Sequence, residues 1–269
     1  MSGPTAPDSK AIHRPVRRHG DGDRPTDDQA VVVAEEPLEI RLSGTPLAVV
    51  MRTPGDDVDL ITGFALTEGI LLAPGELRDV TELGDGRWEI GLADGVDVDP
   101  EQFRRNLYAT SSCGVCGKAS IDAVRIAAAA PEPLGRVDPD VLRGLPETMF
   151  SRQEVFHATG GLHAAGLFAV DGTLEVVRED IGRHNAVDKV VGAAARRSWR
   201  LPGRILLVSG RVSFEIVQKA AVAGIPAVAG ISAPSSLAID LADELGMLLV
   251  AFLRGSTFNV YAGADRIGS

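Results

Sequence analysis

The chain has few cysteines, few aromatic residues, no long apolar run and a deficit of positive charge. Only two of its 269 residues are cysteine, and aromatic residues make up 4% of the sequence. A disulfide framework is excluded, because the two cysteines are close neighbours whose disulfide closes a very small loop. No apolar run is long enough to cross a bilayer, so we expect no membrane partner. The formal net charge of −10 argues against a nucleic-acid partner.

Apolar side chains are almost missing from the first 29 residues, which are rich in Pro, Gly, Asp and Arg. Such a composition cannot bury a core, so residues 1–29 are expected to form a disordered tail. The tail also lacks the apolar stretch of a secretory signal, which predicts a cytoplasmic protein whose cysteines stay reduced. The whole chain is 45% hydrophobic and 24% charged, which is ordinary for a globular protein with a full core.

The apolar pattern divides the remaining chain into a small lobe, a cysteine-containing loop and a larger domain. We expect an N-terminal α+β lobe over residues 30–108, a loop over 109–120 and an α/β domain over 121–269. In the lobe, strands are predicted near 31–40, 47–51 and 87–92, with a helix over 60–69. After the loop, helices are predicted over 120–130 and 149–157.

Strands and helices alternate regularly in the second half of the chain. Short connections between them predict a mainly parallel sheet covered by helices on both faces, so the fold class is α/β. The expected strands are 167–170, 174–178, 204–209, 227–231 and 247–252, and the expected helices are 185–195, 213–223 and 235–245.

The two cysteines, Cys113 and Cys116, form a CxxC motif in a Gly- and Ser-rich segment that ends at Lys118. Three functions fit the motif: a redox dithiol, half of a zinc site, or a carrier that holds sulfur as a persulfide. A pair of buried inert thiols is less favoured, because Gly and Ser neighbours are poor core formers. Lys118 could stabilise a thiolate at this site.

A zinc site would need two further ligands, which His157, His163 and His184 could supply. The zinc-dependent nucleobase deaminases place H-x-E before P-C-x-x-C. Here none of these histidines is followed two residues later by glutamate, and Ser112 precedes Cys113. Deaminase chemistry is therefore disfavoured, and we expect no catalytic zinc.

Three predicted strand ends carry Gly together with Arg, Ser or Thr, at residues 179–185, 209–213 and 254–257. In open α/β sheets, ligands bind beyond the carboxyl ends of the strands, where helix N-termini favour anions. These segments therefore predict a site for a phosphate-bearing ligand. His163 follows Gly160 and Gly161, which allow close approach of a ligand, although it could equally pack in the core. His184 is flanked by Asp180 and Arg183, and either ligand binding or simple helix capping fits it.

Five motifs stand out along the chain: residues 63–70 (GFALTEGI), 110–117 (TSSCGVCG), 159–165 (TGGLHAA), 178–189 (REDIGRHNAVDK) and 209–218 (SGRVSFEIVQ). Together and in this order they resemble the formate dehydrogenase accessory sulfurtransferases of the FdhD type. The resemblance runs from about residue 31 to Tyr261.

The resemblance implies a sulfurtransferase that takes sulfur from a cysteine desulfurase as a persulfide. Its client is formate dehydrogenase, whose molybdenum or tungsten bis(molybdopterin guanine dinucleotide) cofactor receives the sulfur. Cys113 matches the persulfide-bearing cysteine, and Cys116 the second functional cysteine. The family's larger domain is similar to the cytidine deaminase fold, and a homodimer is plausible by the same resemblance. The stretch that matches the family's cofactor-binding segment is Phe252, Leu253, Arg254, Gly255, Ser256 and Thr257.

Beyond that stretch, residues at or near the predicted strand ends are candidate contacts for the phosphates of the guanine dinucleotide. Two other functions remain open: a CxxC dithiol oxidoreductase, and a non-catalytic chaperone that only binds the cofactor. The candidate contacts are His163, Arg183, His184, Arg211, Ser213 and Lys219.

Overall fold

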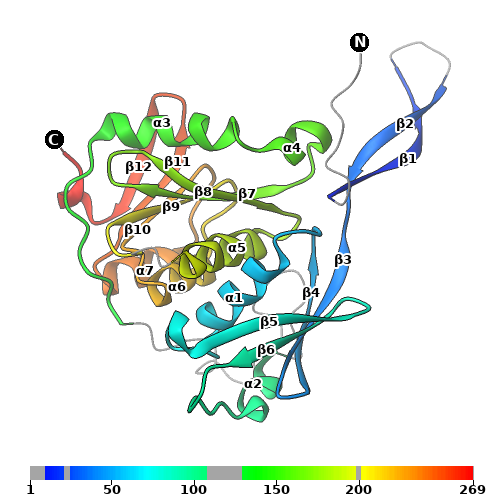
Figure 1. Ribbon diagram of the computed structural model, residues 1–269. Helices are drawn as coiled ribbons and strands as arrows, with labels where there is room; N and C mark the ends of the chain where they lie inside the picture. Colours follow the sequence, from blue (N-terminus) through cyan, green and yellow to red (C-terminus); the bar gives the residue numbers. More distant parts are fainter. Residues whose placement is uncertain (1–9, 21–24, 108–128, 198–200, 269) are drawn as a thin grey trace.

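The computed structural model describes residues 10–20, 25–107, 129–197 and 201–268. Helices α3 and α4 lie on one face of a six-stranded sheet and α5, α6 and α7 on the other, while α1 lies between α5 and a four-stranded sheet (Figure 1). The helices are α1 (Asp57–Thr67), α2 (Pro100–Leu107), α3 (Pro139–Phe150), α4 (Glu154–Thr159), α5 (Arg183–Arg196), α6 (Phe214–Val222) and α7 (Ser236–Glu244). The strands are β1 (Ala11–Arg18), β2 (Thr26–Val33), β3 (Glu36–Leu42), β4 (Thr45–Arg52), β5 (Leu77–Gly84), β6 (Arg87–Leu92), β7 (His163–Ala169), β8 (Leu174–Asp180), β9 (Arg204–Val208), β10 (Ala227–Gly230), β11 (Leu248–Arg254) and β12 (Thr257–Ala262).

The six-stranded sheet has the order β12-β11-β10-β9-β7-β8 and confirms the α/β class. Strands β9, β10 and β11 pair in parallel, and β8 runs in the same direction. However, β7 lies antiparallel between β8 and β9, and β12 is antiparallel to β11, so the sheet is mixed rather than mainly parallel. The reason is local: tight turns at Gly172 (φ 86°) and Gly255 (φ 53°) join neighbouring strands as hairpins, which must pair antiparallel.

Helices cover both faces of this sheet, as the sequence predicted. On one face α3 buries Leu142, Leu145 and Met149, whose spacing of three and four residues forms a single apolar stripe. On the opposite face α6 and α7 bury Val217 and Ala238 among a second set of core residues. None of the described helices is long and apolar enough to cross a membrane.

The four-stranded sheet, in the order β4-β3-β6-β5, belongs to the predicted N-terminal lobe. Its residue Ile40 packs in one hydrophobic cluster with Leu60 and Ile61 of α1 and with Val187 and Val190 of α5. The lobe and the larger domain therefore share a core. This cluster fixes α5, and the residues at its N-terminus, relative to both sheets.

The expected N-terminal disorder is wrong for residues 11–18 and 26–29, which form the hairpin β1–β2 that projects from the body (Figure 1). Apolar residues at the base of the hairpin explain its attachment, because Ala11 packs with Val155 and Leu162 in a small cluster. Along its length, cross-strand ion pairs such as Arg17–Asp27 align the strands, although they are exposed and individually weak. Residues 1–9 and 21–24 lie outside the described structure.

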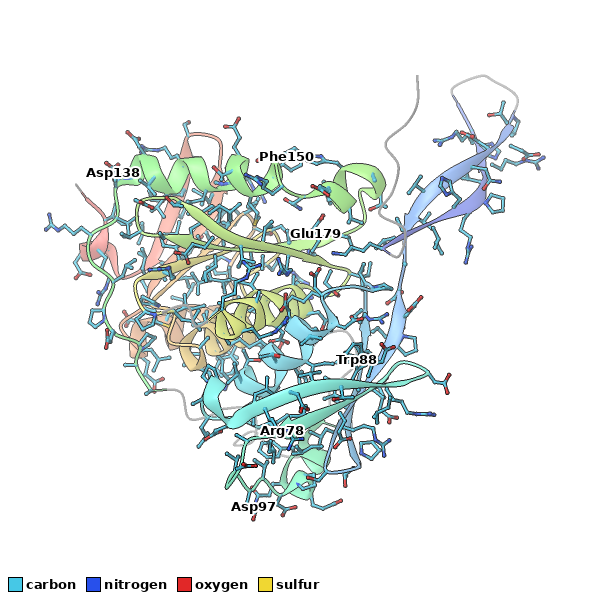
Figure 2. All side chains as sticks on the ribbon, viewed as in Figure 1. Arg78, Trp88, Asp97, Asp138, Phe150 and Glu179 are labelled. Carbon is cyan, nitrogen blue, oxygen red and sulfur yellow. The ribbon has the colours of Figure 1, made fainter. Side chains whose placement is uncertain are left out.

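The helix expected over 149–157 is also wrong in its bounds, since α3 ends at Phe150 and α4 begins at Glu154. The break follows from a tertiary contact: Glu179 of β8 lies beside the start of α4 (Figure 2). Its carboxylate accepts hydrogen bonds from the amides of Val155 (3.0 Å) and Phe156 (2.7 Å), which starts a new helix there. The helix expected over 120–130 lies mostly outside the described residues.

Candidate functional site

The carboxyl ends of β8, β9, β10 and β11 meet at one edge of the six-stranded sheet, which we call the ligand edge. Three of these strand ends lead into the N-termini of α5, α6 and α7. Strand β7 begins at the same edge, where His163 pairs with Asp180. The ligand edge comprises His163 and residues 180–184, 209–213, 231–232 and 252–257.

His163 and Arg183 come together over Gly210. A Cβ at position 210 would lie 3.3 Å from His163 Nδ1 and 3.6 Å from Arg183 Cδ, so the missing side chain lets both residues pack there. The strand ends beneath them are held by Ser209, whose Oγ accepts a hydrogen bond from the amide of Ala164 (2.9 Å). The structure thus joins two predicted site residues that are 20 positions apart.

Arg183 presents a buried Nε that has no hydrogen-bond partner among the described residues. It is the first residue of α5, whose N-cap Gly182 offers no side chain to cap the helix. The start of α6 is similar, because the side chain of its N-cap Ser213 makes no capping bond within the described structure. A buried guanidinium nitrogen and two helix N-termini together favour an anion such as phosphate.

His184 lies beside α6, where its Nε2 is 2.8 Å from Glu215 Oε2 and 3.4 Å from Ser213 Oγ. Both side chains of the His184–Glu215 pair are largely buried. This contact brings together the predicted residues His184 and Ser213. Glu215 was not predicted from the sequence, since nothing in its spacing links it to a histidine 31 positions earlier.

The environment of His163 favours its neutral imidazole. Burial lowers the pKa of His163 most, and the positive charge of Arg183 lowers it further; His184 and Arg211 have smaller effects in the same direction, which Asp180 opposes. His163 can therefore donate or accept a hydrogen bond at the ligand edge without adding charge. Positive charge at the ligand edge comes from Arg183 and from the exposed Arg211 and Arg254.

The stretch 252–257 forms the end of β11 and the turn into β12. Phe252 has a positive φ of 52° and is partly exposed, with its amide bonded to Ser232 O (3.1 Å). The Arg254 guanidinium lies 5.7 Å from the Phe252 ring centre and donates to Ile231 O (2.8 Å). Strands β9 and β11 are two strand spacings apart, so the end of β11 is separated from the end of β9 by about 10 Å across the sheet along the same edge.

Two predicted contacts do not fit the ligand edge. Leu253 is completely buried in the core on the α3 face with Leu248 and Val250, because an irregularity of the strand between Ala251 and Arg254 breaks the simple alternation of side chains. Lys219 is buried between α1, α5 and α6, where its ammonium donates to Asp188, Glu68 and Thr67. We therefore exclude both side chains from ligand contact. Cys113 and Cys116 lie outside the described residues, and α2 ends at Leu107, before the loop predicted over 109–120.

The fold and the ligand edge define an α/β protein whose mixed sheet carries arginines and helix N-termini at its carboxyl edge. The model of the FdhD/NarQ family matches residues 33–268. The chain belongs to the FdhD/NarQ family, which confirms the resemblance.

Relatives and a solved structure agree with this assignment. The protein named sulfur carrier protein FdhD of Streptomyces coelicolor is 54% identical over 249 residues, covering 88% of each chain. The protein of the same name from Mycobacterium tuberculosis is 49% identical over 272 residues, covering 95% of this chain and 98% of its own. A crystal structure from Desulfotalea psychrophila, assigned as a formate dehydrogenase accessory protein, has a TM-score of 0.77 and covers 96% of this chain and 99% of its own. At 24% identity it shows the fold alone.

Proposed function

We propose that this chain is a sulfur carrier for formate dehydrogenase that holds sulfur as a persulfide on Cys113. Its substrate is the molybdenum or tungsten bis(molybdopterin guanine dinucleotide) cofactor, which receives the sulfur. Family membership and the named sulfur carriers at about half identity support the carrier role. The single structural observation that supports the substrate is the buried Arg183 Nε at the start of α5, which has no hydrogen-bond partner among the described residues and fits a phosphate of the guanine dinucleotide.

Sulfur loading is a thiolate exchange. The Cys113 thiolate attacks the terminal sulfur of a persulfide on a cysteine desulfurase, the donor's S–S bond breaks, and the donor leaves as a thiolate. A new S–S bond forms on Cys113, the terminal sulfur keeps its proton, and no external oxidant or reductant is consumed. The reaction requires Cys113 to be ionised, and Cys116 assists transfer or stabilises the persulfide. By this activity the chain is a sulfurtransferase, and it acts in the cytoplasm, where cysteines stay reduced.

At the ligand edge, the chain's own residues bind and orient the substrate. Arg183 and the start of α5 hold a phosphate, while neutral His163 donates or accepts a hydrogen bond beside it. Arg211 adds long-range attraction, which the net charge of −10 opposes elsewhere on the protein. At the end of β11, about 10 Å across the sheet from the end of β9, Phe252 offers a partly exposed ring and Arg254 a cation. These two side chains can contact another part of the same elongated ligand.

Incubation with a cysteine desulfurase and cysteine is expected to add the mass of one sulfur atom to the protein. The added sulfur should be lost on treatment with a reductant and should be absent from Cys113→Ala, because that variant lacks the attacking thiolate. Intact-mass spectrometry measures both results. Cys116→Ala is the matched control and should still acquire sulfur.

The same measurement separates the rival functions. A loss of two hydrogens with no added sulfur supports the dithiol oxidoreductase, and an unchanged mass supports the chaperone. Transferable sulfur on Cys113→Ala contradicts the assigned carrier.

Replacing both Arg254 and Thr257 by alanine is expected to weaken binding of guanosine diphosphate roughly 10- to 100-fold, since a charge-assisted hydrogen bond is lost. Isothermal titration calorimetry measures the dissociation constant. Arg17→Ala, on the distant hairpin, is the control for the loss of a positive charge. Unchanged affinity in the Arg254→Ala, Thr257→Ala protein contradicts a role for this turn.

A further inference from the structure

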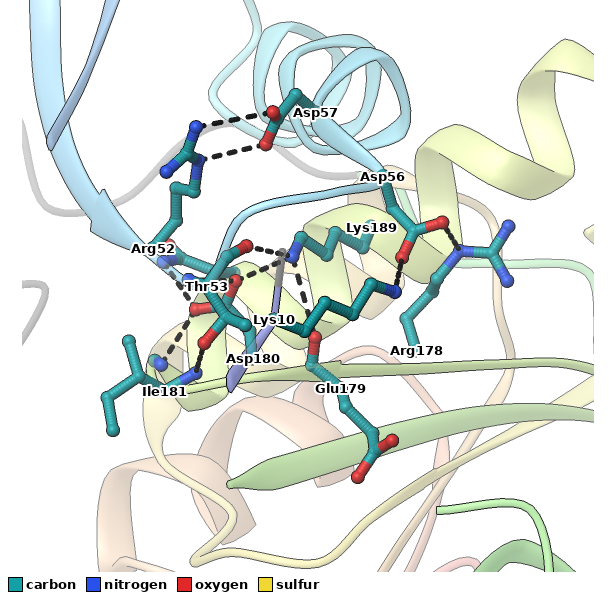
Figure 3. Close-up of polar contacts among 12 residues, drawn as sticks. Lys10, Arg52, Thr53, Asp56, Asp57, Arg178, Glu179, Asp180, Ile181 and Lys189 are labelled. Atoms are coloured by element: carbon teal, nitrogen blue, oxygen red, sulfur yellow. Dashed lines mark hydrogen bonds and ion pairs between the residues drawn. The ribbon is translucent and has the colours of Figure 1, made fainter. Parts of the chain in front are cut away.

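The β4–α1 connection of the small lobe reaches the N-terminus of α5 through a set of buried polar contacts (Figure 3). Its central residue is Thr53, which is completely buried. The Thr53 amide donates to Asp180 Oδ2 (3.1 Å), its Oγ1 accepts from the amide of Ile181 (3.2 Å), and its carbonyl accepts from Lys189 Nζ (2.9 Å). All three polar groups of Thr53 are thus used to hold the end of β8 and the start of α5.

Asp180, which is bonded to Thr53, also forms hydrogen bonds with the first turn of α5. Its Oδ1 accepts from the amide of Gly182 (2.8 Å) and from Asn185 Nδ2 (2.9 Å), and its Oδ2 pairs with the buried Lys189 (2.7 Å). Asn185 also donates to Met51 O (2.8 Å), two residues before Thr53. The turn is tight, because a Cβ at Gly182 would lie 2.9 Å from Asn185 Nδ2.

These contacts fall on both sides of the two residues that reach the ligand edge. Positions 180, 181 and 182 precede Arg183 and His184, and position 185 follows them. On the far side, His184 is held by Glu215 of α6. The first turn of α5 is therefore fixed between the small lobe and α6.

We propose that Thr53 is a positioning residue for the ligand edge, acting through Asp180 and Ile181 on Arg183 and His184. The small lobe, which contributes no side chain to the ligand edge as defined above, thereby sets the geometry of the anion site. This inference rests on the proposed function for the identity of the ligand, although the placement of His184 can be measured without one.

Thr53→Val removes the hydroxyl and keeps the shape of the side chain, leaving the partly buried amide of Ile181 without its acceptor. We expect binding of guanosine diphosphate to weaken roughly three- to tenfold, the effect of one hydrogen bond. The imidazole NMR signals of His184, assigned by their loss in His184→Gln, should shift in the ligand-free protein. Thr53→Ser keeps the hydroxyl and should restore both the affinity and the signals.

Thr62→Val is a matched control. Thr62 is also buried, but its Oγ1 has no hydrogen-bond partner among the described residues, so its loss should change neither readout. If Thr53→Val does not fold, Asn185→Ala, which cuts the bonds to Met51 O and Asp180, is judged by the same criteria. A folded variant with wild-type affinity and unshifted His184 signals overturns the proposal.

The two measurements distinguish failure of this inference from failure of the proposed function. If the wild-type protein does not bind guanosine diphosphate, the assigned substrate is wrong, and the His184 signals alone decide on Thr53. If the wild type binds and Thr53→Val binds equally well with unmoved signals, only the positioning role is wrong. A lower melting temperature with both readouts unchanged shows that Thr53 stabilises the fold without positioning the site.

Discussion

Replacing Gly192 with alanine is expected to lower the free energy of unfolding by at least about 3 kcal/mol, beyond the usual range for overpacking. Gly192 lies on α5 where α1 crosses it, and a Cβ there would overlap the carbonyl oxygen of Asp59 and lie 2.7 Å from the Gly63 amide nitrogen. The obstacles are backbone atoms of another helix, which cannot rotate away as a side chain can. Relief therefore requires the two helices to separate, and the shared core opens with them.

Gly63 of α1 lies at the same crossing, and a Cβ added there would overlap the carbonyl oxygen of Asp188 in α5. Gly63→Ala should be destabilising to a similar extent. Urea unfolding followed by circular dichroism measures both variants. Gly144→Ala is the matched control: Gly144 is an exposed residue within α3, and a Cβ there would meet no atom within 4 Å, so alanine should stabilise by up to about 1 kcal/mol. A Gly192→Ala protein within about 1 kcal/mol of wild type would contradict the close helix crossing.

The crossing of α1 and α5 could not be predicted from the sequence, whereas other parts of the fold could. The alternation of strands and helices after residue 163 was predicted well, because α6 and α7 are each followed by a glycine, Gly224 and Gly246, that marks the helix end in the sequence. Strands β5 and β12 were not predicted, because their mixed burial leaves little apolar periodicity. The insertion of β7 between β8 and β9 depends on which hairpins form and how they dock, and no local signal carries that information.

The candidate site was predictable to the extent that it follows the strand ends. Arg183, His184, Arg211 and Ser213 follow the carboxyl ends of strands, as expected. His163 lies at the same edge for a different reason, because β7 runs antiparallel to its neighbours and begins there. The supporting partners could not be found this way, since they are distant in sequence. Thr53 and Asp180 are 127 positions apart. The prediction of Lys219 as a ligand contact was wrong for a related reason: a lysine in the last turn of a helix is usually exposed, and only its carboxylate partners show why this one is buried.

The buried charges of Lys219 and Asp188 should contribute to the free energy of unfolding as a pair, so that the effects of replacing them are not additive. Lys219 Nζ lies 2.9 Å from Asp188 Oδ1 and 2.8 Å from Glu68 Oε1. Burial alone lowers the pKa of Lys219, but Asp188 and Glu68 outweigh it and raise the pKa above its ordinary value of 10.5. The charged form is therefore favoured by folding. Its contribution is complete at neutral pH and is lost only when the pH rises through the elevated pKa in the alkaline range.

Asp188→Asn leaves the Lys219 ammonium with one carboxylate partner in place of two and is expected to lower the free energy of unfolding by about 3–5 kcal/mol. Lys219→Met should have a comparable effect, because among the described residues the Asp188 carboxylate then keeps only the Thr67 hydroxyl, at 2.7 Å, as a hydrogen-bond donor. The double variant should lose clearly less than the sum of the two, since no isolated buried charge remains. Urea unfolding at neutral pH measures the free energies of this double-mutant cycle.

Asp27→Asn, which breaks the exposed ion pair with Arg17, is the control and should change the free energy of unfolding by no more than about 1 kcal/mol. Additive losses in the double variant would show that the two charges do not depend on each other, and that the contact between α5 and α6 is held by apolar packing alone.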